Sequence, residues 1–367
     1  MGGMLESLAA GALLLMSTPN AGPADAADAR GAVVMLPSLP DSTGWGGMFA
    51  GVLGGSLVAG GGSQFPDQPL WRGGQKTFSD RVFVLAEPKG SWREASVRLP
   101  RAAAHFAAAP GEGAIQVAGG IGAEGALAEA FTVRAAGSEY VIDRLPSLPR
   151  PLVYAGAIVA AGRFYVAGGQ HDPAVRAASR EVWSLGLAGR EPSWRREPDL
   201  PGTGVFLGAM AEVDGSLFHV GGVAFDGAGR SVQLRQVLRL APGAAAWEEL
   251  PPLPEARVGA VSPCAVIAGS RLLVVGGYAA AFAGERREHP GFSRQTWIYH
   301  LAERRWAEGP VLPHVAPVDR DATGDAGPAP MIAAPGVVWR DLYVAVGGEV
   351  RASVRTPAVV GIPLRGL

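Results

Sequence analysis

The stretch Gly162-Arg163-Phe164-Tyr165-Val166-Ala167-Gly168-Gly169 shows the pattern that decides the fold of this chain: a short apolar and aromatic run that ends in a pair of glycines. The same ending occurs six times, at Gly61-Gly62, Gly119-Gly120, Gly168-Gly169, Gly221-Gly222, Gly276-Gly277 and Gly347-Gly348. Successive pairs lie 49 to 71 residues apart. This recurrence indicates a repeat architecture, and β-rich runs bounded by Gly and Pro predict that each repeat is a small sheet.

A Leu-Pro pair recurs in step with the glycines, at Leu36-Pro37, Leu99-Pro100, Leu145-Pro146, Leu200-Pro201, Leu250-Pro251 and Leu312-Pro313. Most of these pairs follow a tryptophan, namely Trp92, Trp194, Trp247 or Trp306. We expect four strands in each repeat, with glycines where two backbones approach closely and the tryptophan between neighbouring repeats. This organisation resembles the kelch motif over nearly all of residues 33–367. The resemblance implies an all-β fold, a six-bladed kelch-type β-propeller.

The two ends of the repeat region predict how the ring of blades closes. The first complete repeat begins near Trp45, yet a strand-like segment at residues 32–36 already precedes it. The last repeat offers strands at residues 331–334, 342–346 and 357–363 and is one strand short. We therefore expect the N-terminal strand to complete the last blade, because a closed ring leaves no blade incomplete. Residues 31–367 then form a single six-bladed domain.

The composition is that of a neutral globular protein. The 32 Lys and Arg residues are balanced by 33 Asp and Glu residues, so there is no basic excess to bind nucleic acid. Cys264 is the only cysteine, which excludes an intrachain disulfide and a Cys-rich metal site. We predict no metal and no other cofactor.

Residues 1–30 have the character of a signal peptide and flexible leader. An apolar run at residues 8–16 is too short to span a bilayer and is followed by a small, polar stretch with alanine-rich sites. The expected protein is therefore periplasmic or secreted, with no membrane span. The region before the apolar run lacks Lys and Arg and carries Glu6, so a disordered leader on a cytoplasmic protein is the alternative.

Long loops and arginines mark one face of the predicted propeller. When the innermost strand of each blade comes first, the loops after the glycine pairs and the connections after the Leu-Pro pairs open on the same face. The three longest irregular stretches, residues 63–79, 278–294 and 314–329, belong to this face and are candidates for binding loops. Arg101, Arg150 and Arg257 follow Leu-Pro pairs and are expected near the axis, where guanidinium groups can bind a carboxylate. Alternatively, each arginine caps a turn or pairs with a nearby glutamate.

The segment Gly347-Gly348-Glu349-Val350-Arg351-Ala352-Ser353-Val354-Arg355-Thr356 carries the most specific chemistry. Glu349, directly after a glycine pair, is expected at the channel mouth, where a carboxylate can transfer protons. Arg355 begins the returning strand and can hold Glu349 or contact a substrate. A structural ion pair within a hairpin is the alternative interpretation of these two residues.

Gly348-Glu349-x-Arg351-x-x-x-Arg355-Thr356 is similar to the Gly-Glu-x-Lys/Arg-x-x-x-Arg-Thr segment of the bacterial N-acetylneuraminate epimerases, the sialic acid mutarotases. The whole chain also resembles the cyclically permuted mutarotase family. The first repeat carries this resemblance in Gly60-Gly61-Gly62-Ser63-Gln64-Phe65-Pro66-Asp67, followed by Trp71, Gly73-Gly74 and Lys76. Later repeats carry it in residues 145–152 and 167–170 and in His289-Pro290-Gly291-Phe292. The permutation accounts for the place of the Glu349 motif in the final blade. Two features depart from the family pattern, which more often has Asn at position 64 and has a tryptophan in the second repeat.

The resemblance implies an isomerase, a mutarotase or epimerase that interconverts the anomers of a sialic-acid-type sugar such as N-acetylneuraminate by general acid/base catalysis. Glu349 takes the role of the family's proton acceptor. We expect Arg355 and one or more of Arg101, Arg150 and Arg257 to bind the carboxylate of the sugar acid, Lys76, Gln170 and His171 to contact hydroxyls, Trp71 to stack on the sugar, and Arg351 to join the substrate-binding residues.

Two other classes of protein share this architecture. A non-catalytic propeller would bind a carbohydrate or protein partner on the same face without proton transfer. A copper oxidase of the galactose oxidase kind needs a Cys cross-linked to Tyr and two His ligands, and neither the setting of Cys264 nor the spacing of the histidines provides that arrangement. The Arg, Lys and His content of the loops favours a small acidic ligand over an apolar protein interface. The sequence specifies neither the sugar nor the oligomeric state.

Overall fold

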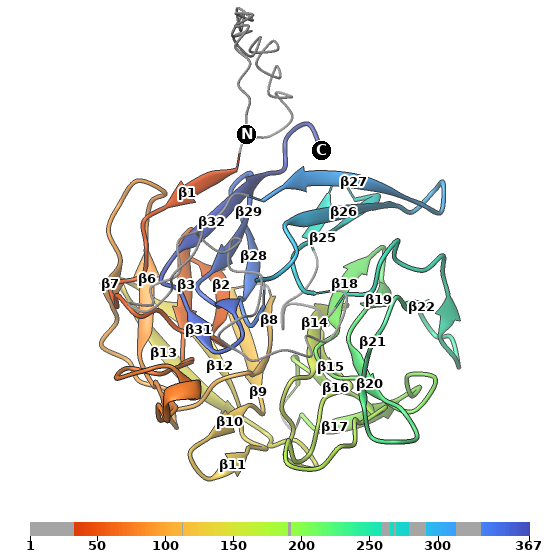
Figure 1. Cartoon of the computed structure of the whole chain (residues 1–367), viewed down its shortest axis with the longest axis horizontal. Coiled ribbons are helices and arrows are strands. Elements are labelled where there is room, and N and C mark those ends of the chain that lie inside the picture. Colours follow the sequence, from red (N-terminus) through yellow and green to blue (C-terminus); the bar gives the residue numbers. More distant parts are fainter. Residues whose placement is uncertain are drawn as a thin grey trace, which may run out of the picture. The chain divides into compact units, whose positions relative to one another are not determined.

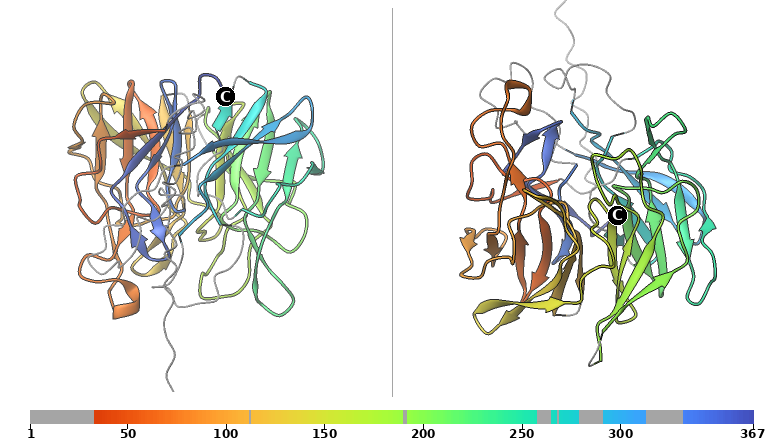
Figure 2. Two further views of the ribbon diagram at one scale, coloured as in Figure 1. Left: turned by 45° about the horizontal axis from the view of Figure 1, so that its top comes forward. Right: turned by 90° about the horizontal axis from the view of Figure 1, so that it is seen from below.

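Six four-stranded antiparallel sheets surround a common axis in this computed structural model (Figure 1), which describes residues 33–111, 113–189, 192–257, 265–267, 269–278, 291–312 and 332–367. The first strand of every sheet contacts the first strand of both neighbouring sheets, which places these strands innermost and closes the ring. Figure 2 shows the same ring from two further directions. The predicted six-bladed, all-β propeller is confirmed.

Blades 1 to 5 use their strands in chain order from the axis outward, and blade 6 does the same except that its outermost strand is β1. Blade 1 consists of β2 (Phe49–Leu53), β3 (Ser56–Gly60), β6 (Val82–Leu85) and β7 (Arg93–Glu94). Blade 2 consists of β8 (Ala107–Gly111), β9 (Ala114–Ala118), β12 (Ala130–Ala136) and β13 (Glu139–Leu145). Blade 3 consists of β14 (Gly156–Ala160), β15 (Arg163–Ala167), β16 (Val182–Gly186) and β17 (Trp194–Glu197). Blade 4 consists of β18 (Ala209–Val213), β19 (Ser216–Val220), β22 (Val237–Leu240) and β23 (Glu248–Glu249). Blade 5 consists of β24 (Ala265–Ile267), β25 (Arg271–Val274), β26 (Gln295–His300) and β27 (Arg305–Val311). Blade 6 consists of β28 (Gly336–Trp339), β29 (Leu342–Val346), β32 (Val359–Pro363) and β1 (Val34–Leu36).

The strand β1 closes the ring as predicted. It pairs antiparallel with β32, from Val34 opposite Gly361 to Leu36 opposite Val359, and so supplies the outer strand of blade 6. The expected inner strand at residues 331–334 is wrong, because the inner strand is β28 at Gly336–Trp339. The chain just before β28 instead bridges to the loop after the last glycine pair, through Ile332 and Glu349.

The glycine pairs hold each blade against the next one. The N–H of the second glycine donates to a carbonyl of the following blade in five pairs, over 2.7–2.9 Å: Gly62 to Ala103, Gly120 to Leu152, Gly169 to Val205, Gly222 to Arg257 and Gly348 to Trp45. At Gly168 a Cβ would stand 2.3 Å from that acceptor, the oxygen of Val205, and φ is +70°. Glycine is therefore required both for the left-handed backbone and for the close approach.

Every blade contains an equivalent buried leucine, whose backbone N–H donates to a carbonyl one or two residues before the third strand of the blade. The six equivalent residues are Leu39, Leu99, Leu148, Leu200, Leu253 and Leu312. The Leu-Pro pairs expected at Leu36, Leu145 and Leu250 therefore lie three residues before the true repeat position. These segments contain two Leu-Pro pairs in succession, and the hydrogen-bond pattern selects the second pair.

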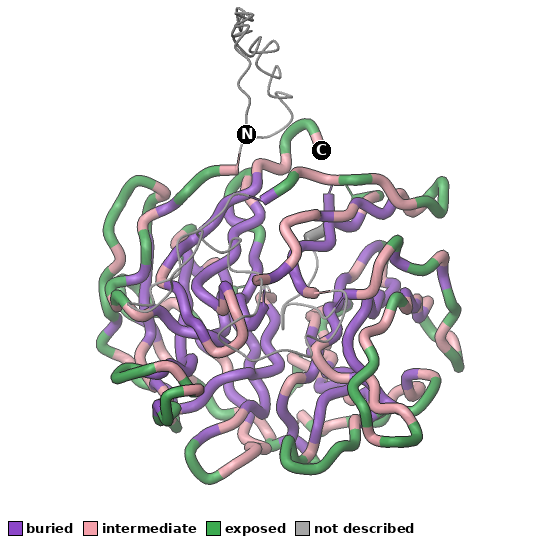
Figure 3. Tube along the Cα trace, viewed as in Figure 1, coloured by how far each residue is buried: buried purple, intermediate pink, exposed green. Residues whose placement is uncertain are grey.

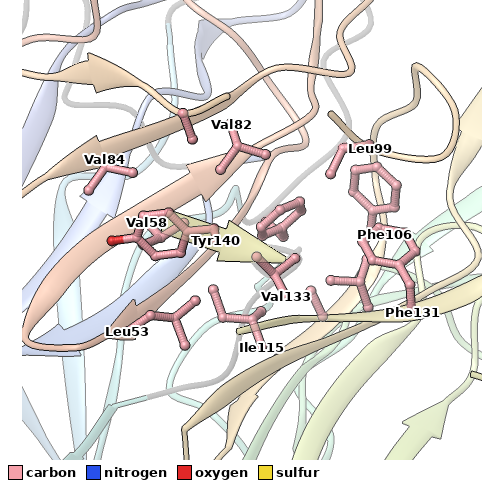
Figure 4. Close-up of a cluster of buried hydrophobic side chains, with 14 of the residues drawn as sticks. Leu53, Val58, Val82, Val84, Leu99, Phe106, Ile115, Phe131, Val133 and Tyr140 are labelled. Atoms are coloured by element: carbon pink, nitrogen blue, oxygen red, sulfur yellow. The ribbon is translucent and has the colours of Figure 1, made fainter. Parts of the chain in front are cut away.

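The hydrophobic core is divided among the seams between blades (Figure 3). Figure 4 shows the seam between blades 1 and 2, where Phe106, Phe131 and Tyr140 pack with Leu53, Ile115 and several valines. The tryptophans lie at these seams as predicted, and each donates its indole N–H to a carbonyl of the preceding blade: Trp92 to Pro37, Trp194 to Pro146, Trp247 to Pro198 and Trp306 to Pro251. No helix in the described ranges has the length and apolar character needed to cross a bilayer.

Candidate functional site

The loops after the glycine pairs and the segments that enter the blades meet on one face, which we call the loop face. Isolated bridges join them in five blades: Gly46 with Ser63, Ala104 with Ile121, Val153 with Gln170, Phe206 with Val223 and Ile332 with Glu349. Of the three long loops, the first is described throughout and carries β4 (Ser63–Gln64), a 3-10 turn η1 (Leu70–Arg72) and β5 (Thr77–Phe78). Residues 279–290 and 313–331 of the other two lie outside the described residues, as do Cys264 and the expected leader at 1–30.

A ring of backbone hydrogen bonds circles the axis at the loop face. Its members, which we call the axial ring, are Gly47, His105, Tyr154, Leu207 and Ala333, one from each of blades 1 to 4 and 6. The N–H of each residue in blades 1 to 4 donates to the ring carbonyl of the preceding blade, over 2.6–3.3 Å. All five have φ between +52° and +72°, a conformation that costs non-glycine residues about 1–3 kcal/mol each. The side chains of this ring therefore have imposed directions around the axis.

Glu349 and Arg355 form an ion pair at the loop face of blade 6. They face each other across the hairpin of β30 (Glu349–Arg351) and β31 (Val354–Arg355), and Arg355 Nη1 donates to Glu349 Oε1. The other carboxylate oxygen, Oε2, accepts the backbone N–H of Ser353 at 3.1 Å. The Glu349 side chain keeps 17% of its surface exposed, whereas that of Arg355 keeps 2%. The carboxylate is thus oriented by two donors and still reachable.

The guanidinium of Arg355 is held mainly by blade 1. Its Nε donates to the carbonyl of Ser63 at 2.9 Å and its Nη2 lies 3.3 Å from the Ser63 hydroxyl. The ring of Phe65 lies 5.5 Å from the guanidinium carbon, and a Cβ at Gly46 would stand 2.7 Å from Nε. Burial lowers the pKa of Arg355 to about 10, so the group stays cationic at neutral pH. All three nitrogens donate inward, and Arg355 therefore positions Glu349 instead of presenting itself to a ligand.

Within the described part of the chain, two buried polar atoms near this pair make no hydrogen bond. They are Nδ1 of His105 and Oε1 of Gln64, the residue after Ser63. Burial, together with the charges of Arg355 and Lys76, lowers the pKa of His105 well below its usual range, so the imidazole is neutral. Buried polar atoms without partners are rare in folded proteins, so each one calls for an explanation.

The long loop after the first glycine pair brings one predicted residue close to this cluster. Lys76 is exposed, its Nζ lies 5.9 Å from the centre of the Phe65 ring, and its charge acts on His105. Trp71 is half-buried within η1 of the same loop. Arg351 is half-buried on β30, on the same hairpin as Glu349.

The three arginines expected around the axis do not share contacts with one another or with Glu349. Arg101 is exposed and pairs with Glu129 at 3.0 Å, and Arg150, at the matching position of the next blade, is exposed. The carbonyl of Arg257 accepts the N–H of Gly222, the second glycine of a pair. Arg257 is therefore equivalent to the residues that accept this hydrogen bond in the other blades, which are the buried Trp45, Ala103, Leu152 and Val205.

Arg257 is buried at the seam of blades 4 and 5. Its Nη2 contacts Glu255 and donates to the carbonyl of Gln295 at 3.2 Å, while Nε and Nη1 make no hydrogen bond to a residue that the structure describes. Burial lowers the pKa of this guanidinium. Its place in the seam is the reason why it does not reach the channel mouth.

Two further predicted residues have structural contacts of their own. The Nε2 of Gln170 donates to the carbonyls of Val175 and Ala177, over 3.2 and 3.3 Å, and so shapes its loop. His171 Nδ1 lies 2.8 Å from the carbonyl of Pro151, and its Nε2 lies 3.8 Å from Glu181. Neither side chain contacts the Glu349–Arg355 pair.

Sequence reasoning missed Ser63, Phe65, His105 and Tyr154. The signal that could have found the last two is their equivalent place in the segments Ala103-Ala104-His105-Phe106 and Leu152-Val153-Tyr154-Ala155, where a polar side chain interrupts an apolar entry to the inner strand. Ser63 acts mainly through its backbone carbonyl, which has no signature in a sequence.

Metal ligands do not gather in the described ranges. No three side chains of the His, Cys, Asp and Glu types lie there in an arrangement that could hold a metal ion. Cys264, His289 and His314, which the copper-oxidase alternative would draw on, lie outside the described residues.

A cavity of about 250 Å³ lies away from this site, at the turns between β18 and β19 and between β26 and β27. Arg239 and Arg304 line it, and both guanidinium groups pair with Glu248, at 3.7 and 3.0 Å. These turns join the strand ends opposite the loop face, so the cavity is separate from the Glu349 site.

Comparison with known proteins bears on the fold. No family model matches the chain, and no curated protein matches it. A solved structure described as the structure of YjhT is similar, with a TM-score of 0.59 and 14% sequence identity, over 72% of this chain and 84% of that chain. The likeness shows the fold. At this identity it carries no residue roles to the present chain.

Proposed function

We propose that this propeller is a sugar mutarotase or epimerase that interconverts the anomers of a sialic-acid-type sugar at the Glu349 site. The observation that carries the proposal is the reachable Glu349 carboxylate, oriented by Arg355 and Ser353 at the loop face. Buried polar atoms of Gln64 and His105 that make no hydrogen bond to a described residue lie nearby. The similarity of residues 348–356 to the epimerase segment supports the same assignment.

The chemistry needs only proton transfer. Glu349 accepts the proton of the anomeric hydroxyl while the bond from the anomeric carbon to the ring oxygen breaks and that oxygen gains a proton. The open-chain ketone rotates and closes on its other face by the reverse transfers, so atoms and charge balance. A positioned general base of this kind contributes about 10²–10⁴-fold to the rate.

Local charge supports an acidic sugar. Arg355 pairs with Glu349, Arg351 lies on the same hairpin, and Lys76 lies over the Phe65 ring that also contacts Arg355. A cationic rim attracts anionic ligands. We assign the sugar carboxylate to Lys76, which lies over the Phe65 ring beside Arg355, and to Arg351, which shares the β-hairpin of Glu349.

A non-catalytic binding platform is the second candidate. Both oxygens of Glu349 already accept protein donors, as they do in a structural ion pair. In that case the same polar cluster would bind a carbohydrate without exchanging a proton.

One-dimensional proton NMR of freshly released α-N-acetylneuraminate tests the proposal. The protein should speed the approach to the β anomer, and Glu349→Gln should remove at least 90% of this acceleration. Glu129→Gln is the matched control, because it removes a carboxylate that pairs with an arginine outside the site. A wild-type protein that leaves the spontaneous rate unchanged contradicts mutarotation of this sugar, and saturation-transfer signals from the bound sugar would then favour the binding platform.

Export remains a proposal that rests on residues 1–30. Expression of the full chain in a bacterium with a secretory pathway, followed by mass measurement of the periplasmic fraction, tests it. A full-length protein found only in the cytoplasm contradicts it.

A further inference from the structure

The axial ring is unequal around the axis. Its residues in blades 6 and 1, on either side of the Glu349–Arg355 pair, are the small Ala333 and Gly47. The residues in blades 2 and 3 are the large, polar His105 and Tyr154. In a six-membered ring, blade 3 lies across the axis from blade 6. Tyr154 therefore belongs to the wall that faces the Glu349 hairpin.

The large side chains lean from blade to blade toward Arg355. A Cβ on Gly47 would stand 2.6 Å from His105 Nδ1, so the imidazole lies over the glycine of the preceding blade. The ring of Tyr154 lies 4.8 Å from that of His105, and the charge of Arg355 acts on both side chains. The tyrosine is thus turned toward the catalytic pair proposed above.

The phenol of Tyr154 has the state that a proton donor needs. The residue is partly exposed, and its hydroxyl makes no hydrogen bond to any residue in the described ranges. Burial raises the pKa of Tyr154, so the hydroxyl keeps its proton at neutral pH. Its backbone is held at φ +59°, which is rare for an aromatic residue and is shared by the other members of the axial ring.

We propose that Tyr154 is the second proton-transfer residue of the site and donates to the ring oxygen of the sugar while Glu349 accepts from the anomeric hydroxyl. This inference rests on the mutarotase function proposed above. During ring opening the phenol O–H bond breaks and the sugar ring oxygen gains that hydrogen. On closure the new hydroxyl returns the proton to the tyrosinate as the ring C–O bond forms, and Glu349 returns its proton to the former carbonyl oxygen. No oxidant, reductant or cofactor takes part.

Among the neighbouring groups, Tyr154 fits this role best. The imidazole of His105 is buried, with Nδ1 against Gly47 of the preceding blade. Lys76 is exposed on the loop and is suited to the sugar carboxylate. A neutral phenol at the axis, in contrast, can reach a ring oxygen without bringing a further charge.

Steady-state mutarotation of N-acetylneuraminate by Tyr154→Phe tests the inference. We expect kcat to fall by about 10²-fold or more with KM changed less than about threefold, because only the proton donor is lost. Tyr165→Phe is the matched control, since Tyr165 is a half-buried tyrosine of the same blade on β15. Circular dichroism and thermal melting are used to check that both variants fold.

The outcomes separate the two proposals. If the wild-type protein accelerates mutarotation and Tyr154→Phe keeps its kcat, the role of Tyr154 is wrong and that of Glu349 stands. A variant that loses sugar binding but not kcat also overturns the role, because Tyr154 would then only bind. Absence of wild-type acceleration overturns both.

A second variant covers a failure of Tyr154→Phe to fold. Replacement of Tyr154 by 3,5-difluorotyrosine keeps the shape and makes the phenol more acidic. The alkaline limb of the pH–rate profile should then move to lower pH. An unmoved limb contradicts proton transfer by Tyr154.

Discussion

Arg355 and Ser63 are 292 residues apart in the chain, yet Nε of the arginine donates to the carbonyl of the serine at 2.9 Å. Arg355 belongs to blade 6 and Ser63 to blade 1, so this hydrogen bond crosses the seam where the ring closes. The same guanidinium holds Glu349. One side chain therefore both links the two blades at this seam and orients the candidate catalytic carboxylate.

Arg355→Met should abolish most of the activity and destabilise the fold. It leaves the carbonyl of Ser63 and one oxygen of Glu349 without their donor, at a cost of about 2 kcal/mol in the free energy of unfolding. Urea denaturation and the NMR assay measure the two effects. Arg101→Met is the control, because its ion pair with Glu129 is exposed and should leave both quantities essentially unchanged. Equal stability and activity of Arg355→Met and the wild type would show that the seam contact has no role.

Gly46→Ala should impair the site while the propeller stays folded. The added Cβ would stand 2.7 Å from Nε and 2.9 Å from Cδ of Arg355, so the guanidinium must move away from Ser63. We expect at least a tenfold loss of kcat in the NMR assay, because Glu349 loses its orientation. Gly227→Ala is the control, since a Cβ there meets nothing within 4 Å. Full activity of Gly46→Ala would mean that the position of Arg355 does not matter.

His219 should make the fold sensitive to acid. It is buried in β19, neither ring nitrogen has a hydrogen-bond partner among the described residues, and burial lowers its pKa from 6.5 to about 4. Below pH 6.5 this histidine binds a proton in the unfolded chain but stays neutral in the folded protein. Its contribution to the free energy of unfolding is therefore complete above pH 6.5 and falls by about 3 kcal/mol as the pH drops to about 4. His105 has the same sign.

His219→Val is the variant that tests this acid sensitivity. Valine occupies the equivalent positions Val117 and Val166, two residues before their glycine pairs. Urea denaturation of this variant between pH 7 and pH 4.5 should show a shallower loss of stability than the wild type, with a remainder from His105 and the carboxyl groups. An unchanged slope would contradict a neutral, buried His219.

The architecture was predictable because its signals are local and repeated. Each glycine pair reports a place where a Cβ would collide with the next blade, as at Gly168, and six such places count the blades. The missing strand of the last repeat predicted closure by β1, which pairs with β32. The Leu-Pro signal was less reliable, because two such pairs stand side by side at Leu36 and Leu39 and the local sequence does not distinguish them.

The sequence by itself determined the all-β propeller, its six blades, the closing strand and the hairpin that carries Glu349 and Arg355, because all of these depend on residues close together in the chain or on a regular period. Only the tertiary structure decided which arginines reach the axis. In the folded chain, Arg257 is buried in a seam between blades and Arg101 forms an ion pair with Glu129. Tyr154 of blade 3 lies close enough to the Glu349 hairpin of blade 6 for the charge of Arg355 to act on it. The physical reason is that side-chain direction and partner depend on the twist and packing of neighbouring blades, and no repeat period encodes a contact between residues hundreds of positions apart.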